Sequence, residues 1–185
     1  MCEVRCGTLL VSLLGLLIAS PAAGAGEQPT AQVVGEMGVR ELPAQTILVL
    51  PVRGSYEQHG SVIPQLMTYA GIQQIIRGAP FAIYYDNPET VPTDSLRWEV
   101  CVPVPAGTGA TSPFEVREMP AIAAAVADCQ GPYEEASSCY GSLIGWVAAQ
   151  GLTISGPPQE HWLSDAQTTP PESLIARIIF PVARP

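Results

Sequence analysis

The sequence predicts an α+β domain of two β-α-β-β halves around a pseudo-twofold axis, with antiparallel sheets flanked by helices and a central cleft. Three observations predict this fold: an internal repeat, one amphipathic helix in each half, and short apolar runs before and after each helix. The chain of 185 residues is 47% apolar and 14% charged, which suits one domain with a hydrophobic core rather than a disordered chain.

The internal repeat defines the two halves. Residues 38–44 (GVRELPA) recur as residues 115–121 (EVREMPA), and residues 54–57 (GSYE) recur as residues 131–134 (GPYE). Two copies of this length are too long for solenoid units and favour a duplicated half-domain. A stretch rich in Gly, Thr, Ser and Pro separates them. We therefore expect one domain over residues 38–185, divided into repeat 1 (38–104), a linker (105–113) and repeat 2 (114–185).

Each half is expected to begin with a strand after a Pro-Ala turn, at residues 46–50 and 122–127. An amphipathic helix follows, capped by Ser61 in the first half and by Ser138 in the second. The apolar positions at helical spacing are Ile63, Leu66, Met67 and Ala70 in the first helix and Cys139, Leu143, Trp146 and Val147 in the second. Two further strands complete each half, at residues 81–85 and 98–104 and at residues 159–163 and 175–182.

The first 25 residues have the pattern of a secretory signal. Arg5 precedes an apolar run at residues 8–19, and small residues end at Ala25, where we expect cleavage. The alternative is an uncleaved anchor, but this run is shorter than the roughly 20 residues that span a bilayer. The pattern therefore predicts an exported protein, periplasmic or secreted, without a stable membrane span, and a flexible segment at residues 26–37.

Charge and residue usage exclude several function classes. The chain has 17 acidic residues, 8 basic residues and no lysine, so its net charge of −9 should repel nucleic acid. Without lysine it has neither a Schiff-base nucleophile nor a P-loop. The two histidines, His59 and His161, and the cysteines lack the usual spacing of metal ligands, so we expect no metal and no cofactor.

Three cysteines remain after the signal, an odd number in a compartment that permits disulfides. Cys129 and Cys139 flank a Gly-Pro turn and are the candidate disulfide, which would stabilise the fold by about 2 to 3 kcal/mol. Cys101 would then be free. The sequence leaves open whether this pair forms.

Several segments together resemble the GyrI-like family, the effector-binding domain of multidrug-sensing regulators. They are Gly131-Pro132-Tyr133, residues 156–162 (GPPQEHW) and residues 178–182 (IIFPV), with residues 78–85 and 98–104 as the first-half counterparts. The resemblance covers residues 39–182. It implies a duplicated fold with a cleft between the halves, lined by aromatic residues and carboxylates, that accepts hydrophobic cations or other small apolar molecules. Some stand-alone members of the family hydrolyse strained toxins.

Strand alternation selects the residues that would line such a cleft. Tyr84 in the first half aligns with Trp162 in the second, and Glu160 shares a strand face with Trp162. Aromatic faces and a carboxylate are the groups that hold an organic cation in a partly dry pocket. The candidate ligand-binding residues are Glu99, Glu160, Tyr84, Trp162, Trp98, Phe81 and Arg177. By contrast, Tyr56, Tyr69, Tyr133, Leu143 and Trp146 are assigned to core packing.

Arg177 departs from the family pattern, because it aligns with Glu99 where many members have an acidic residue. The two side chains could pair across the axis, or Arg177 could receive an anionic ligand.

The signal pattern and the family resemblance together predict an exported protein that sequesters or senses small hydrophobic or amphipathic compounds. The alternatives are a hydrolase that uses Glu99 or Glu160, and a structural envelope protein without ligand. The sequence does not indicate an oligomeric state.

Overall fold

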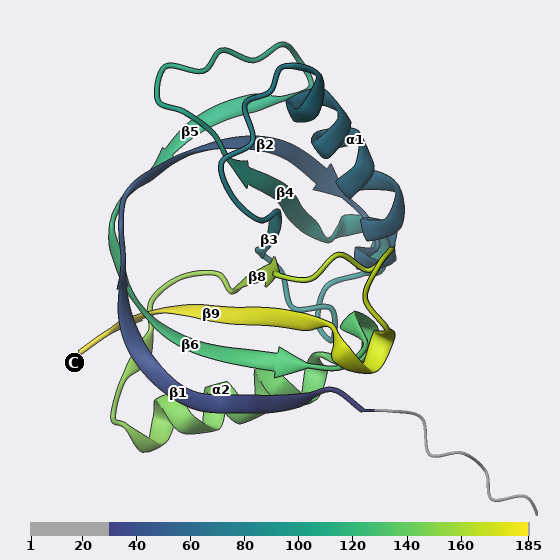
Figure 1. The fold of residues 1–185 in the computed structure, drawn as a ribbon. Helices are drawn as coiled ribbons and strands as arrows, with labels where there is room; N and C mark the ends of the chain where they lie inside the picture. The colour runs from purple at the N-terminus through teal and green to yellow at the C-terminus, as the bar shows by residue number, and fades with distance from the viewer. Residues whose placement is uncertain (1–29, 185) are drawn as a thin grey trace, which may run out of the picture.

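The computed structural model describes residues 30–184, so the predicted signal lies outside the described residues. Within them, nine strands and two α-helices form an α+β fold, which confirms the predicted class (Figure 1). No helix of this part of the chain is long and apolar enough to cross a membrane.

The strands form an antiparallel sheet in the order β1-β6-β9-β8-β3-β4-β2-β5, and β7 pairs with β9 beside this path. In chain order the strands are β1 (Gln32–Leu42), β2 (Gln45–Arg53), β3 (Phe81–Tyr84), β4 (Arg97–Pro103), β5 (Glu115–Met119), β6 (Ile122–Gln130), β7 (Thr153–Ile154), β8 (Gln159–Trp162) and β9 (Ile175–Ala183). The helices are α1 (His59–Ile72) and α2 (Ser137–Ala149).

Both halves contain the predicted order of elements. The first half has β2, α1, β3 and β4, and the second has β6, α2, β8 and β9, with the short β7 added. The origin of this order by duplication, and its pseudo-twofold symmetry, stay predictions. The halves meet where β3 pairs with β8, with Ala82 opposite Glu160. This pairing makes one continuous sheet instead of the two small sheets that we expected, because it satisfies backbone groups that two separate edges would leave open.

Two strands that the sequence did not predict, β1 and β5, link the halves. β1 pairs with β6 of the second half, and β5 pairs with β2 of the first half. The β1–β2 and β5–β6 connections both pass along the left-hand side of the molecule in Figure 1. Residues 32–37, which we expected to be flexible, therefore belong to β1. The reason is that this largely exposed segment is ordered by its partner strand rather than by an apolar pattern of its own.

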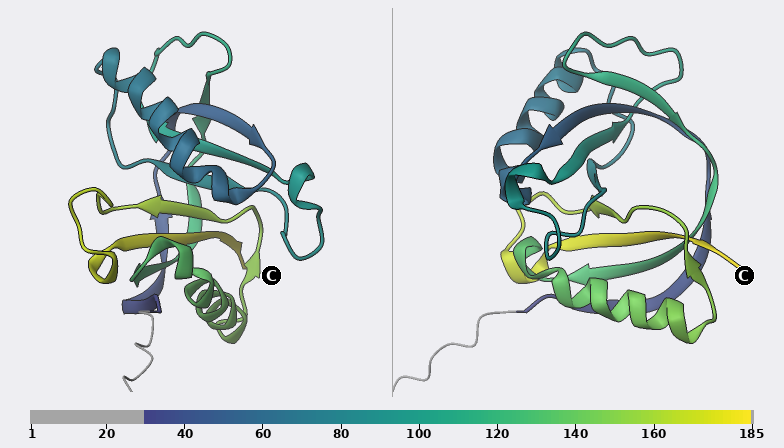
Figure 2. Two further views of the ribbon diagram at one scale, coloured as in Figure 1. Left: turned by 90° about the vertical axis from the view of Figure 1, so that its right-hand side faces the viewer. Right: turned by 180° about the vertical axis from the view of Figure 1, so that it is seen from behind.

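Both helices lie on the same face of the sheet, and in the left view of Figure 2 both face the viewer. α1 packs on the first half through Leu66 and Ala70, and α2 packs on the second half through Leu143 and Val147. Neither predicted serine cap is correct. The hydroxyl of Ser61 donates to the carbonyl of Gln58, and the hydroxyl of Ser138 donates to the carbonyl of Ala31.

Candidate functional site

A cleft of about 2020 Å³ lies on the helical face of the sheet, where β3 and β8 join the halves. We call it the interhelical cleft. Its walls come from both helices, including Ile63 and Met67 of α1 and Tyr140 and Ile144 of α2. Ile63 and Met67 were expected on the buried face of α1; they are half-buried because they border this open space.

The floor of the cleft contains the residues that strand alternation places on one face. Tyr84 at the end of β3 and Glu160 and Trp162 on β8 all line it. Ala82, directly opposite Glu160, is fully buried in the sheet beside them. The sequence pattern of period two was therefore sufficient to orient these three side chains.

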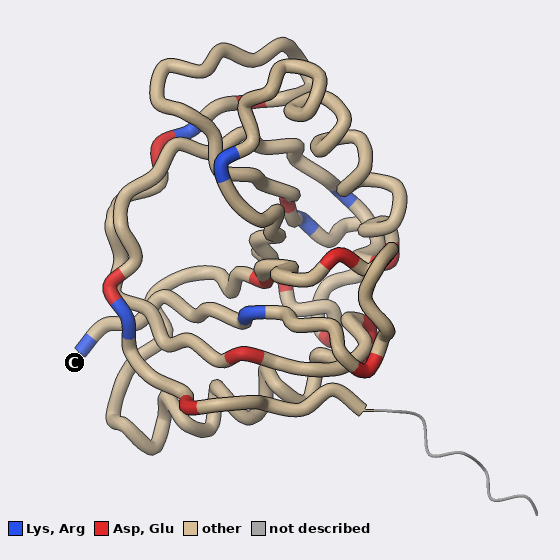
Figure 3. The backbone as a smooth tube through the Cα atoms, in the orientation of Figure 1, with Lys and Arg blue, Asp and Glu red and all other residues tan. Residues whose placement is uncertain are grey.

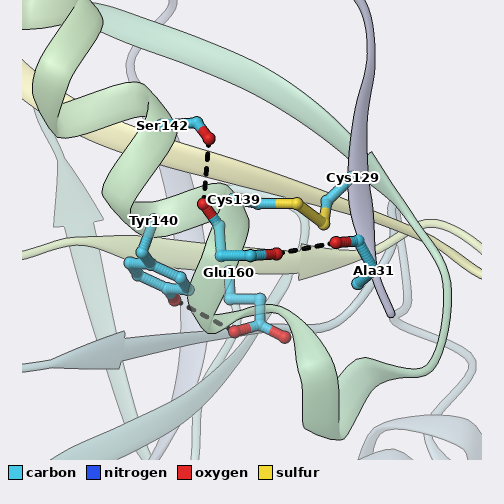
Figure 4. Close-up of a disulfide and its surroundings, with 7 residues drawn as sticks. Ala31, Cys129, Cys139, Tyr140, Ser142 and Glu160 are labelled. Atoms are coloured by element: carbon cyan, nitrogen blue, oxygen red, sulfur yellow. Dashed lines mark hydrogen bonds between the residues drawn. A yellow bond between two sulfur atoms is a disulfide. The ribbon is translucent and has the colours of Figure 1, made fainter. Parts of the chain in front are cut away.

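Glu160 is a buried carboxyl group held by neutral donors. Its side chain is in the core, with the residue 7% exposed. The hydroxyl of Tyr140 donates to Oε2 at 3.0 Å, and the indole N–H of Trp162 donates to Oε1 at 3.1 Å; Figure 4 shows the contact with Tyr140. Among the described residues, no arginine forms an ion pair with it. Burial raises the pKa of Glu160 to about 7, against the opposing effect of the two hydrogen bonds.

Several aromatic side chains lie beside this carboxyl: Tyr56, His59, Tyr84 and Trp162, which we call the aromatic group. Tyr56 meets Tyr84 edge-on at 4.8 Å between ring centroids, and His59 meets Trp162 at 5.5 Å. The hydroxyl of Tyr84 also lies 2.9 Å from Nε2 of His59. Burial lowers the pKa of His59 to about 4, so its imidazole is neutral near pH 7. The cleft therefore offers aromatic surface without a positive charge.

The rim of the cleft is acidic. Carboxylates from several loops line it, and within residues 30–184 no arginine does; they are Glu57, Asp86, Glu89, Glu134 and Asp165. Asp86 alone of this group forms an ion pair within the described residues, with Arg97. Figure 3 shows acidic positions along the right-hand side of the molecule. A low-dielectric cleft bordered by one sign of charge attracts ligands of the opposite sign, here cations.

A disulfide joins Cys129 at the end of β6 to Cys139 in the first turn of α2, the pair that the sequence left open. The segment that it closes supplies Tyr133, Glu134, Ala136 and Ser137 to the cleft wall. Tyr140, the donor to Glu160, follows Cys139 directly, as Figure 4 shows. The disulfide therefore holds the loop and helix turn that face Glu160. Cys101 is free and buried, and burial raises the pKa of its thiol well above the usual value.

The sequence matches the model of the GyrI-like small molecule binding domain over residues 33–183. The chain belongs to the GyrI-like family. No curated protein matches it. The fold of this GyrI-like domain is also found in solved structures of low sequence identity, which support the fold alone.

One solved structure is the EcmrR C-terminal domain, with 18% identity and a TM-score of 0.71 over 81% of this chain and 98% of that one. In the EcmrR–DNA complex, the match covers only 58% of the EcmrR chain, at 18% identity, a TM-score of 0.72 and 81% of this chain. SAV2435 bound to tetraphenylphosphonium gives 16% identity and a TM-score of 0.56 over 80% of this chain and 94% of that one. The expectation that this GyrI-like domain binds no nucleic acid stays a prediction.

Four of the predicted ligand-binding residues lie outside the cleft lining. Trp98 is 1% exposed and lies under the aromatic group, where its indole N–H donates to the carbonyl of Gly54 at 3.2 Å. Phe81 points to the opposite face of the sheet and stacks on His161 at 4.3 Å. Glu99 and Arg177 are on that opposite face too. Neighbouring residues of a strand face opposite ways, so Trp98 and Glu99 could not both line the cleft.

Glu99 and Arg177, whose pairing the sequence left open, do not pair with each other. Glu99 forms an ion pair with Arg117 of β5 and accepts a hydrogen bond from Tyr85 at 2.5 Å. Arg177 instead donates from Nε and Nη2 to Asp128 of β6, at 2.7 and 3.0 Å. Asp128 lies directly opposite Arg177 on the neighbouring strand β6, whereas Arg117 reaches Glu99 of β4 from β5, across the intervening strand β2. Each charge is therefore neutralised within its own half of the sheet.

Sequence reasoning missed four residues of this GyrI-like cleft. Tyr56 and Tyr133 line it but were assigned to the core, His59 was considered only as a metal ligand, and Tyr140 was not considered. Tyr56 and Tyr133 occupy the same position in the repeated GSYE and GPYE segments, which was a usable signal. No local pattern marks His59 or Tyr140, because both reach the cleft only through the packing of their helices.

We expect Glu99→Gln to lower the free energy of unfolding by about 1 to 2 kcal/mol and to leave ligand affinity of the cleft unchanged. The amide carries no charge to neutralise Arg117. Because the side chain of Arg117 is 44% exposed, water solvates its charge and limits the loss of stability. Urea denaturation and a ligand titration measure the two effects. The double variant Glu99→Gln/Arg117→Gln should recover part of the stability. Lost affinity without lost stability would instead assign Glu99 to ligand binding.

Proposed function

We propose that this GyrI-like protein is exported and binds hydrophobic or amphipathic cations in the interhelical cleft, and so sequesters or senses them. The observation that carries the proposal is Glu160, a buried carboxyl at the floor of an aromatic cleft. Among the described residues, its hydrogen-bond donors are all neutral and no arginine lines the cleft. A cation would supply the positive charge that this carboxylate lacks.

The chemistry of binding follows from the same contacts. As a cation enters, Glu160 loses its proton, because the positive charge offsets the desolvation that raises its pKa to about 7. Tyr140 and Trp162 then donate to an ionised carboxylate, which strengthens both hydrogen bonds. The faces of neighbouring aromatic rings contribute about 0.5 to 2 kcal/mol each to a desolvated cation. Binding of tetraphenylphosphonium, a lipophilic cation, to the structural neighbour SAV2435 supports this ligand class.

Export is proposed from two features of the chain. Residues 1–25 have the pattern of a secretory signal. The disulfide between Cys129 and Cys139 suits an oxidising compartment, because disulfides are rare in the cytosol of mesophiles.

The open cleft favours a binding protein over the structural alternative, in which side chains would fill this space. Of the two carboxylates suggested for a hydrolase, Glu99 is ion-paired on the opposite face, which leaves Glu160. That alternative stays a prediction.

Titration with tetraphenylphosphonium, followed by tryptophan fluorescence, tests the proposal. We expect Glu160→Gln to weaken binding at pH 8 at least tenfold, or about 1.4 kcal/mol, because the amide cannot balance the ligand charge. Glu115→Gln, an exposed site outside the cleft, is the matched control and should bind as the wild type does. The wild-type affinity should increase about tenfold for each unit by which the pH is raised towards 7, because protons compete with the cation for Glu160. Above pH 7 the affinity should stay constant.

Two results would overturn the proposal. One is equal affinity of the wild type and Glu160→Gln for tetraphenylphosphonium. The other is equal wild-type affinity for this cation and for neutral triphenylphosphine oxide, since the aromatic surface alone would then account for binding. Localisation of a full-length tagged chain, with and without residues 1–25, tests export separately; retention of both forms in the cytoplasm would exclude it.

A further inference from the structure

A second, smaller cavity lies on the face of the sheet opposite to the helices. Its volume is about 210 Å³, and we call it the rear pocket. Gln159 and His161 of β8 and Arg177 of β9 give it a polar floor. The apolar wall comes mainly from the β1–β2 and β5–β6 connections: Leu42, Pro43, Met119, Pro120, Ile122 and Ile179. Alternate residues of β8 thus face two cavities, since Glu160 and Trp162 line the interhelical cleft.

The floor of the rear pocket has hydrogen-bond donors without partners. Gln159 is 4% exposed, and its Oε1 lies 3.1 Å from Nε2 of His161, which therefore carries the proton of this hydrogen bond. Within residues 30–184, the amide NH₂ of Gln159 and Nη1 of Arg177 have no hydrogen-bond partner. Within the same residues no wholly buried side-chain nitrogen or oxygen lacks a partner, so this amide donor is open to the cavity and is suited to a ligand that supplies an acceptor.

The charged side chains around the pocket are already paired, so a bound anion would be balanced by protonation of His161. Arg177 is neutralised by Asp128, and the Glu99–Arg117 pair on the same face of the sheet is likewise balanced. His161 and Arg177 are the only titratable residues that line the pocket within the described part of the chain. Burial, and secondarily the charge of Arg177, lower the pKa of His161 to about 4, so the imidazole is neutral at pH 7. An anion beside it would oppose both effects and favour protonation of Nδ1.

We propose that the rear pocket is a second ligand site, which takes a small organic carboxylate with an apolar body. The carboxylate accepts from the amide of Gln159, from Nη1 of Arg177 and from protonated His161, and the apolar body contacts the prolines and aliphatic residues of the wall. Charge-assisted hydrogen bonds of this kind fix a carboxylate more strongly than neutral donors would. The site differs from the interhelical cleft in the sign of the ligand charge and in the face of the sheet.

Benzoate is the probe, and the imidazole signals of His161 in NMR spectra of the wild-type protein are the readout. We expect benzoate to shift these signals, to raise the pKa of His161 by about two units, and therefore to bind about tenfold more tightly at pH 5 than at pH 7. Neutral benzamide should bind at least tenfold more weakly than benzoate at pH 5. No shift of the His161 signals in millimolar benzoate, or equal binding of benzamide, would overturn the proposal.

Variants separate this site from the interhelical cleft. Gln159→Leu keeps the side-chain size but removes the amide donor, and should weaken benzoate binding at least tenfold while tetraphenylphosphonium binding persists. Glu160→Gln should leave benzoate binding unchanged. Loss of benzoate binding in Glu160→Gln, with the His161 signals unperturbed in the wild type, would place the anion in the cleft and overturn the proposal. Because the NMR measurement uses the wild type, a folding defect in a variant does not affect it.

Discussion

The Glu160→Gln variant is expected to be more stable than the wild type at pH 8 and nearly equal to it at pH 4. Burial raises the pKa of Glu160 to about 7, from an ordinary value of 4.5. Below pH 4.5 the carboxyl is protonated in both the folded and the unfolded chain and costs nothing. Between pH 4.5 and 7 the folded chain keeps a proton that the unfolded chain releases, so stability falls as the pH rises. Above pH 7 the full cost remains, at most about 3 to 4 kcal/mol, since one pKa unit corresponds to about 1.4 kcal/mol.

Urea denaturation of both proteins between pH 4 and 8 measures this cost. The difference between the two free energies of unfolding is the relevant quantity, because His59 and His161 titrate in both proteins. Their lowered pKa values, each about 4, make both proteins less stable as the pH falls from 6.5 towards 4. This contribution cancels in the difference. Glu115→Gln is again the control. A difference that does not change with pH would contradict the argued burial of an ionisable Glu160.

The cost of Glu160 gives the cleft a physical reason for binding cations. A carboxylate that destabilises the empty protein at pH 8 gains most from a ligand that neutralises it, so the same group that lowers stability raises affinity. The acidic rim acts in the same direction, because no arginine from the described part of the chain lines the cleft to compete with an incoming cation.

Local sequence patterns were sufficient for part of the fold. Short apolar runs and Gly-Pro turns located β2, β3, β4, β6, β8 and β9, because those signals depend only on neighbouring residues. The strands β1 and β5 were missed because each pairs with the opposite half, and the exposed, polar β1 has no apolar pattern. The order of strands across the centre of the sheet is likewise a long-range property.

In the candidate site too, local patterns predicted some residues, while others depend on contacts between distant parts of the chain. Alternation along β3 and β8 oriented Tyr84, Glu160 and Trp162, which are close in sequence to recognisable turns. The partners of Glu99 and Arg177 depend on the order of the strands in the sheet, which a repeat alignment cannot supply. Tyr140 reaches Glu160 only because α2 docks on the sheet.

The double variant Cys129→Ser/Cys139→Ser is expected to lose about 2 to 3 kcal/mol of unfolding free energy, because the unfolded chain is no longer constrained by the closed loop. It is also expected to bind tetraphenylphosphonium more weakly, by about three- to tenfold. Without the covalent link, the first turn of α2 is held to β6 only by packing. Tyr140, the residue after Cys139, is then less often in position to donate to Glu160.

Urea denaturation and the fluorescence titration measure these two effects, with Cys101→Ala as the matched control because it removes a buried thiol and leaves the disulfide intact. The combination of results identifies the role of the disulfide. A loss of stability with unchanged affinity would mean that packing alone positions Tyr140 and the loop before it. Loss of both, with part of the affinity restored by lower temperature, would mean that the disulfide orders the wall of the cleft. Unchanged stability and affinity would contradict both expectations, since the loop would then be held by its other contacts, among them the hydrogen bond from Ser138 to Ala31.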